Sequence, residues 1–358
     1  MRRASRSPEI RLGRAPRRGV RWWAGRVVGG VLAAIGLLAL AGYLLEPRAA
    51  ARSIEQYPPP GQMVDVGGHR LHLYCTGEGW PVVVIEADQG GYSLQWLAVR
   101  ERAAAFTRVC VYDRAGYGWS EPGPLPRTSG RIADELHALL ENGGEAPPYV
   151  LVGHGFGGQV ARLYASLYPR EVSGLVLVEA ATAEVAAEAP REVRRAQAHE
   201  GRARWRMALV ARVGAMRALA GLGLISPPPW AEALPTSLRE AALAVGKDSA
   251  YYRASAAEAA AWMESQEELE AAGPLPDVPL GIVVRGRAEP LPGVGVETQL
   301  EYERLWRRAQ MSLAGLTSAA DIVVAEESGH DVMLDQPDFL AEAIWGVVQR
   351  ARAERRAD

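Results

Sequence analysis

The 358-residue sequence is poor in metal-binding side chains and contains almost no lysine. It has two cysteines, six histidines and a single lysine, Lys247. The cysteines and histidines do not recur at the short spacings typical of zinc sites, so the sequence predicts no metal site. It also contains no phosphate-cradling glycine loop, and no G-x-G-x-x-G follows the first predicted parallel strand. These absences argue against the usual nucleotide-binding folds and predict no cofactor.

Charge is distributed unevenly although the net charge is only −2. Residues 1–26 contain nine arginines and one acidic residue, so this segment carries +8 and the remainder about −10. An acidic main domain argues against a nucleic-acid-binding surface. We interpret residues 1–26 as a basic cytoplasmic segment.

An uncharged apolar run of nineteen residues, 27–45, follows the basic segment. This length suffices to cross a bilayer, and the preceding arginines place the N-terminus in the cytoplasm and the main domain outside it. The alternative is a cleaved signal peptide, with cleavage at Ala49–Ala51. Residues 46–60, which end in three prolines, are predicted to be a stiff, extended linker.

From residue 61 onward, short apolar runs alternate with helical patterns. The first two strands flank Gly67-Gly68 and read as a hairpin, and the later ones alternate with helices. This order predicts an α/β fold with a mostly parallel, doubly wound sheet. The predicted strands are 63–66, 70–75, 82–87, 108–113, 149–153, 174–179, 280–284 and 321–326, and the predicted helices are 130–140, 159–168, 296–310 and 339–352.

Residues 183–273 interrupt this alternation because they contain no predicted strand. The segment is too long for a loop and is predicted to be a helical lid inserted into a core made of residues 61–182 and 274–352. Within it, residues 205–225 form a basic amphipathic pattern that precedes a break at Pro227–Pro229. Two interpretations remain open for this helix: it packs on the domain below, or it rests on a membrane surface and admits apolar substrate.

The stretch YVLVGHGFGGQV, residues 149–160, reads as a strand, a glycine-rich turn and the start of a helix. Strand, G-x-nucleophile-x-G and helix form the nucleophile elbow, in which glycines such as Gly153 and Gly157 permit a very tight turn. The residue at the tip adopts a strained backbone conformation with positive φ. Here that residue is Gly155, which has no side chain.

Three motifs, two of them outside the elbow, extend this pattern. Tyr112–Ser120 reads Y-D-R-A-G-Y-G-W-S, residues 151–158 match L-V-G-H-S-F-G-G except at Gly155, and a glycine-histidine pair at Gly329-His330 is followed by Asp335-Gln336-Pro337. From about residue 57 to residue 348 the chain resembles the α/β-hydrolase superfamily, which implies an eight-stranded sheet, a lid and a serine nucleophile.

The resemblance also assigns the remaining catalytic roles. His330 corresponds to the general base. The carboxylate that orients it is either Glu289, which follows the seventh strand and is the preferred candidate, or Glu179 at the end of the sixth. The oxyanion hole implied by the family uses the backbone amides of Gln89 and Phe156.

The sequence departs from the family pattern a second time beside the oxyanion hole. Relatives read E-A-G-L-G-G where this chain has Glu86-Ala87-Asp88-Gln89-Gly90-Gly91. A carboxylate at Asp88 would repel a developing oxyanion. We therefore expect a disabled triad in a membrane-anchored protein whose lidded pocket retains a small apolar or ester-like ligand.

The alternative is an active ester or amide hydrolase with a different nucleophile. Asp88 is the best candidate, because some members of the superfamily attack with a carboxylate. His154, Ser93 and Ser120 are weaker candidates, and a water activated directly by His330 is a further route.

The resemblance also implies that the second strand lies beside the fourth, which makes Cys75 and Cys110 neighbours. They could form a disulfide outside the cytoplasm or remain two buried thiols, and both interpretations stay open.

Overall fold

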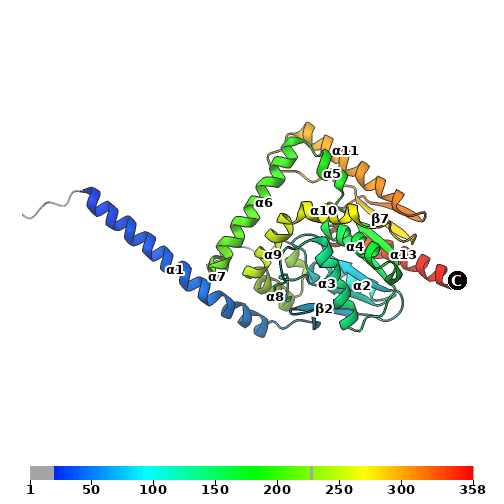
Figure 1. The fold of residues 1–358 in the computed structure, drawn as a ribbon, viewed down its shortest axis with the longest axis horizontal. Coiled ribbons are helices and arrows are strands. Elements are labelled where there is room, and N and C mark those ends of the chain that lie inside the picture. Colours follow the sequence, from blue (N-terminus) through cyan, green and yellow to red (C-terminus); the bar gives the residue numbers. More distant parts are fainter. Residues whose placement is uncertain (1–19, 226–228, 358) are drawn as a thin grey trace, which may run out of the picture.

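The computed structural model describes residues 20–225 and 229–357, whose centre is one eight-stranded sheet (Figure 1). The strand order is β1-β2-β4-β3-β5-β6-β7-β8; β2 is antiparallel to both β1 and β4, and all other pairs are parallel. The predicted mostly parallel, doubly wound sheet is thereby confirmed. The strands are β1 (Gln62–Asp65), β2 (Arg70–Thr76), β3 (Val82–Glu86), β4 (Val109–Tyr112), β5 (Tyr149–His154), β6 (Val172–Val178), β7 (Leu280–Arg285) and β8 (Ala320–Ala325).

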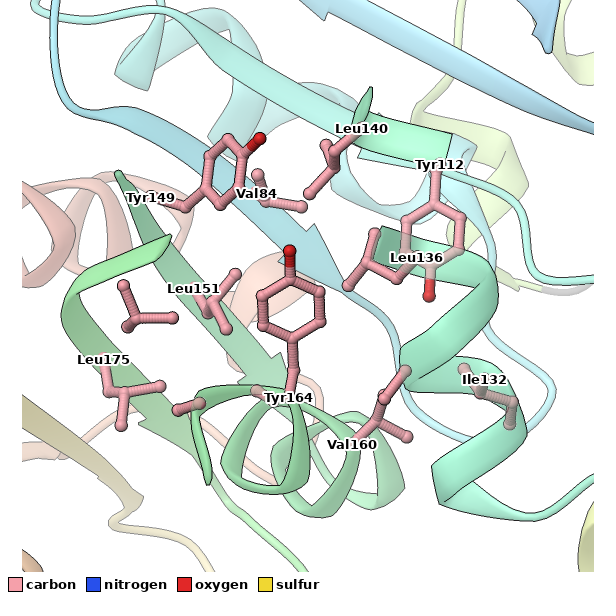
Figure 2. Packing of buried hydrophobic residues seen from close by; sticks show 14 of the residues in the cluster. Val84, Tyr112, Ile132, Leu136, Leu140, Tyr149, Leu151, Val160, Tyr164 and Leu175 are labelled. Carbon is pink, nitrogen blue, oxygen red and sulfur yellow. The ribbon is translucent and has the colours of Figure 1, made fainter. Parts of the chain in front are cut away.

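Helices cover both faces of the sheet, which explains the unbroken apolar runs of its central strands. On one face α3 (Ser129–Asn142) and α4 (Phe156–Leu167) pack on alternate residues of β3 and β5, and Figure 2 shows the Tyr164 ring of α4 between Leu151 of β5 and Leu136 of α3. On the other face α2 (Leu97–Ala103), α12 (Val332–Asp335) and α13 (Pro337–Ala357) cover the intervening residues.

The segment between β6 and β7 is helical where the structure describes it. The expected break at Pro227–Pro229 lies largely outside the described residues. The insertion consists of α5 (Ala183–Glu188), α6 (Arg191–Arg212), α7 (Ala215–Gly221), α8 (Thr236–Gly246), α9 (Ser249–Ala260) and α10 (Trp262–Ala271), with the short 3-10 turn η3 (Pro229–Ala233) before α8. After β7 the chain continues through α11 (Val296–Ser312), and further 3-10 turns are η1 (Ser93–Trp96), η2 (Pro169–Glu171) and η4 (Leu313–Leu316).

Helix α1 (Val20–Gln56) begins the described chain and extends away from the sheet domain (Figure 1). Its Trp22–Gln56 portion is long and apolar enough to cross a membrane. The structure differs from the sequence prediction after residue 46, because the helix continues through Pro47 to Gln56 instead of becoming an extended linker. Most of the predicted basic segment, residues 1–19, lies outside the described residues.

Contacts with the insertion hold this continuation of α1 in place. The Arg217 guanidinium donates hydrogen bonds to the Glu46 carboxylate at 3.1 Å and to the Ser53 hydroxyl at 2.9 Å. Proline inside a helix removes one backbone hydrogen bond and disfavours further turns. The buried Glu46 contact and the Ser53 contact offset that cost.

Cys75 of β2 and Cys110 of β4 are paired residues in the sheet register and form a disulfide. We expect the double variant Cys75→Ala/Cys110→Ala to lose about 2–4 kcal/mol of unfolding free energy, because the bond closes a long loop in the unfolded chain. Denaturant unfolding of the full chain with and without reductant measures the loss. Reductant should lower the midpoint of the wild type and leave that of the double variant unchanged; equal midpoints throughout would contradict the prediction.

Candidate active site

The turn between β5 and α4 has the geometry of a nucleophile elbow. Gly155 at its tip has φ 53° and ψ −120°, and the helix begins at the next residue. A Cβ on Gly153 would lie 2.5 Å from the Gly157 carbonyl oxygen, and a Cβ on Gly157 would collide with the carbonyl oxygens of β3 and the loop after it. The tight approach therefore requires both glycines. The backbone at residue 155 has the positive φ that the elbow imposes on a nucleophilic residue.

Asp88 occupies the space that the missing side chain leaves. A Cβ built on Gly155 would collide with the Asp88 carboxyl group. The Phe156 N–H, one of the two predicted oxyanion donors, donates to Asp88 Oδ1 at 2.6 Å. Asp88 Oδ2 lies 3.2 Å from His330 Nε2. The carboxylate thus contacts both the oxyanion amide and the base.

Glu179, directly after β6, is the carboxylate that faces the other ring nitrogen of His330, Nδ1. Its Oε2 lies 3.5 Å from His330 Nδ1, and it also accepts hydrogen bonds from the Arg285 guanidinium at 2.6 Å and the Trp306 indole at 2.9 Å. Glu179 is fully buried and, within residues 20–225 and 229–357, the one non-glycine residue with positive φ, at 47°. Strain of this kind concentrates at functional sites.

Glu289, the preferred acid from sequence, is placed elsewhere. Its Oε1 accepts a hydrogen bond from the backbone N–H of His330 at 2.7 Å, so it supports the loop and not the imidazole. The loop after β7 brings this carboxylate to the backbone side of Gly329, where a Cβ would lie 2.5 Å from it. The geometry therefore favours Glu179 over Glu289 as the orienting acid, and that role stays a prediction for both.

The two carboxylates change the protonation of His330. Burial alone would lower the pKa of His330, but its hydrogen bonds to Asp88 and Glu179 outweigh burial and raise the pKa to about 10. Burial likewise opposes ionisation of Asp88, yet the His330 hydrogen bond and the nearby imidazoles lower the pKa of its carboxyl well below the usual range. At neutral pH, His330 is therefore an imidazolium between two carboxylates and cannot accept a proton.

This arrangement predicts a defined pH dependence of stability. A raised His330 pKa stabilises the fold fully below about pH 6.5 and less as pH rises toward 10, whereas a lowered Asp88 pKa stabilises it above about pH 4 and less below that. Asp88→Asn should lower the pKa of His330 by about one to three pH units and flatten the alkaline decline. NMR titration of the histidine carbons measures the pKa; Glu121→Gln is the control, and an unchanged His330 pKa in Asp88→Asn would refute the pairing.

His154 precedes Gly155 and contacts the backbone of His330. Its Nε2–H donates to the His330 carbonyl at 2.9 Å, and burial, followed by the charge of His330, lowers the pKa of His154 to about 4. Asp88, His154 and His330 each offer one ligand atom within 4.8 Å of the others, a donor set that suits a divalent cation. A metal there would first have to displace the proton shared by His330 and Asp88.

Sequence reasoning missed the side chain that positions the loop after β3, which contains Asp88 and is called the Asp88 loop below. The buried Arg114 guanidinium lies 2.5 Å from Glu86 Oε1 and 2.8 Å from Glu258 Oε1, and it donates to the carbonyls of Ala87 and Asp88. It therefore ties β3 and the loop after it to helix α9 of the insertion. The arginine of the Y-D-R-A-G-Y-G-W-S motif and the glutamate that ends β3 were the available signals.

The two serines considered as nucleophiles belong to a different network. The Ser120 hydroxyl donates to the Asp113 carbonyl at 2.5 Å and accepts from the His72 N–H at 2.8 Å, and the Ser93 N–H donates to the Asp113 carboxylate at 2.8 Å. His72 Nδ1 completes this buried network with Asp113 Oδ2 at 2.8 Å. These contacts hold the loop after β4 and do not involve His330.

A cavity of about 410 Å³ lies beside the Asp88 loop, between it and the insertion. Gln89, the second predicted oxyanion residue, accepts a side-chain hydrogen bond from Arg204 of α6, and the Tyr251 hydroxyl donates to the Gly90 carbonyl at 3.1 Å. The insertion therefore contacts the loop directly. The cavity is lined by Gly90, Tyr92, Gln95, Ala220, Ile225, Trp230, Ala242, Leu243, Gly246, Lys247, Tyr251 and Tyr252.

Curated relatives resemble this chain over part of their length. It is 26% identical over 323 residues to the probable transporter efuK of Hormonema carpetanum, covering 82% of this chain and 43% of that protein. It is 34% identical over 103 residues to an AB hydrolase superfamily protein of Gibberella zeae, covering 28% of this chain and 32% of the relative. The chain thus spans less than half the length of these relatives.

Solved structures share the fold. A putative epoxide hydrolase from Pseudomonas aeruginosa superimposes with a TM-score of 0.59 at 18% identity, covering 83% of this chain and 98% of that one. A thermophilic esterase from Thermogutta terrifontis has a TM-score of 0.54 at 22% identity, covering 81% and 98%. The alpha/beta hydrolase family model matches residues 71–343, which include the elbow and His330. The chain therefore belongs to the alpha/beta hydrolase family.

Proposed function

We propose that this chain is a membrane-anchored member of the family in which serine-hydrolase chemistry is disabled and a lidded pocket still binds a small apolar or ester-like ligand. One observation carries the proposal: the Asp88 carboxylate fills the space above Gly155 and contacts both Phe156 N–H and His330 Nε2. The tip of the elbow has no hydroxyl, the base is protonated, and an oxyanion donor is already occupied.

The rate lost when a triad nucleophile is removed favours complete loss of activity over a weakened enzyme. Removing the nucleophile of a triad typically costs about 10⁶ in turnover, and the residual acceleration of about 10³–10⁴ over water depends on the oxyanion hole and binding. In this chain the Phe156 N–H already donates its hydrogen bond to the Asp88 carboxylate. That carboxylate also places negative charge where the oxyanion would form. We expect little of that residual acceleration to remain.

The cavity beside the Asp88 loop supports retained ligand binding. Its volume of about 410 Å³ lies within the range of roughly 300–1,000 Å³ that small-molecule pockets occupy. The lining is largely apolar and includes the rings of Tyr92, Trp230 and Tyr251. We infer an apolar ligand, with helices α7, α8 and α9 forming the lid above it.

Three observations support an anchored domain outside the cytoplasm. The apolar part of α1 follows an arginine-rich segment, which favours a cytoplasmic N-terminus. The Cys75–Cys110 disulfide is typical of oxidising compartments. Cleavage at Ala49–Ala51 would detach Glu46 from Arg217, so the packing favours a retained anchor. Protease accessibility of the domain in intact cells tests the topology.

A second candidate function is supported by the order of contacts Asp88–His330–Glu179, which matches nucleophile, base and acid. Asp88 Oδ2 would attack a saturated carbon, forming a carbon–oxygen bond as the leaving group departs with its electron pair. The resulting ester removes the charge of Asp88, and His330 gives its Nε2 proton to the leaving group. Water then adds to the carboxyl carbon of Asp88 and gives a proton to His330 Nε2, which passes it to the departing alkoxide. The alcohol leaves, and the acid proton of Asp88 returns to His330. Direct activation of water by His330 in the resting chain is disfavoured by its protonation.

Turnover and mass measurements on the full chain separate these functions. The disabled-triad proposal predicts no hydrolysis of p-nitrophenyl acyl esters above that of His330→Ala. It also predicts that a terminal epoxide forms no covalent adduct with the chain. After incubation with the epoxide in ¹⁸O-labelled water, the Asp88 carboxylate should contain no ¹⁸O. Ester turnover lost in His330→Ala would overturn the proposal, and an adduct or ¹⁸O label at Asp88 would establish the second function.

A further inference from the structure

Exposed apolar side chains gather on one part of the insertion. Outside α1, the described residues include thirteen large hydrophobic side chains that are exposed, and six of them fall within residues 205–224. Their exposed fractions range from 43% to 73%. We call this set the α6–α7 apolar face; its members are Trp205, Met207, Leu209, Val210, Leu222 and Leu224. Clusters of this kind mark an interaction surface.

The α6–α7 apolar face lies where the apolar part of α1 ends. Gly42 of α1 packs so closely on Val213, between α6 and α7, that a Cβ on Gly42 would collide with the Val213 carbonyl. One turn further along α1, Glu46 pairs with Arg217 of α7 at 3.1 Å. Figure 1 shows α6 running across the direction of α1 and away from this junction. A bilayer around residues 27–45 would therefore have its surface alongside α6.

The charge of the same segment is of one sign. Residues 201–225 contain five arginines and no acidic residue, and Arg202, Arg206 and Arg212 on α6 are exposed. Exposed apolar side chains combined with arginines are typical of helices that lie in the interface of an anionic membrane. A second copy of this chain would place arginines against arginines, which argues against self-association through this face.

We propose that the α6–α7 apolar face lies in the interface of the bilayer that α1 spans, with its arginines among anionic lipid headgroups. The inference rests on the proposed membrane anchorage. A cavity of about 460 Å³, lined by Trp205, Leu209 and Arg212 of α6 and by an alanine-rich side of α9, adjoins this face. Its position beside the lipid interface provides a route for apolar ligands from the bilayer to the insertion.

Fluorescence quenching by brominated lipids tests the placement. The full chain is reconstituted into phosphatidylcholine vesicles with or without phosphatidylglycerol, and single cysteines carry an environment-sensitive dye; the native cysteines are paired and do not react. The test positions are Leu209→Cys and Leu222→Cys. Leu38→Cys in α1 reports insertion of the anchor, and Val296→Cys on α11, which is 78% exposed, reports the water-facing domain.

We expect quenching at residues 209 and 222 to reach at least about half of that at residue 38, with none at residue 296. Quenching at residue 38 alone would overturn this inference and leave the anchor intact, whereas its absence there as well would refute the anchor itself. Cross-linking between copies through unquenched residues 209 and 222 would assign the face to a second copy and also overturn the inference.

A matched pair of variants tests the role of the arginines. Arg202→Gln/Arg206→Gln should reduce quenching at residue 222 on vesicles that contain phosphatidylglycerol, and should have little effect on phosphatidylcholine alone. Arg304→Gln/Arg307→Gln, which removes two exposed charges from α11, is the control. Equal quenching in both double variants on anionic vesicles would refute the headgroup contacts.

Discussion

The double variant Asp88→Gly/Gly155→Ser should hydrolyse p-nitrophenyl acyl esters about 10²–10⁴-fold faster than the wild-type chain. The elbow backbone is already formed, since Gly155 has φ 53° and ψ −120°. Removing the Asp88 carboxylate frees the Phe156 amide for an oxyanion and leaves His330 with one carboxylate partner instead of two. The imidazole can then lose its proton and serve as the base for the new serine.

Neither single variant should gain activity. In Gly155→Ser the new Cβ collides with the Asp88 carboxyl group, so we expect a less stable protein with a blocked oxyanion site. In Asp88→Gly the site opens but contains no nucleophile at the elbow. Steady-state ester hydrolysis and denaturant unfolding of the four proteins measure both effects. A double variant as inactive as the wild type, although folded, would contradict the proposal that Asp88 and Gly155 together disable the site.

The same background identifies the orienting acid. Glu179 lies 3.5 Å from His330 Nδ1, whereas Glu289 contacts the backbone N–H of His330. In the double variant, a further Glu179→Gln change should therefore abolish most of the gained turnover, and Glu289→Gln should preserve most of it. The reverse result would restore Glu289 as the acid.

The strands and the elbow could be predicted from sequence because their signals are local. The continuous apolar runs of β3 and β5 and the glycines at 153 and 157 each determine their own backbone. The relation between Asp88 and Gly155 is not local. Each departure from the family pattern is visible in the sequence by itself. Only the fold brings Asp88 and Gly155, which are 67 positions apart, into contact, so that the Asp88 carboxylate occupies the space beside Gly155.

The remaining differences also arise from tertiary contacts. The sequence allows both Glu289, the preferred candidate, and Glu179, and the facts that favour Glu179 are its positive φ and its approach to the imidazole ring. Pro47 predicts the end of a helix, yet α1 continues because Arg217 holds residues on either side of it. Local rules describe what a segment prefers in isolation, and packing overrides them where buried charges meet.

Arg114→Met should lower the free energy of unfolding by about 3–5 kcal/mol, because it leaves the buried carboxylates of Glu86 and Glu258 without their cation. Burial already raises the pKa of Glu86 above its ordinary value even with Arg114 present. The control is Arg70→Gln, whose partner Glu121 is exposed and which should cost no more than about 1 kcal/mol. Urea unfolding of the full chain in detergent compares the two.

Arg114 also donates to the carbonyls of Ala87 and Asp88, so its loss should loosen the loop as well as the core. Once Asp88 moves away from His330, the pKa of His330 should fall from about 10 in the folded Arg114→Met protein. A large stability loss with an unchanged His330 pKa would mean that Arg114 supports only the contact between β3 and α9. A joint change in both quantities would show that the insertion, through Glu258 and Arg114, holds the Asp88 carboxylate beside Gly155.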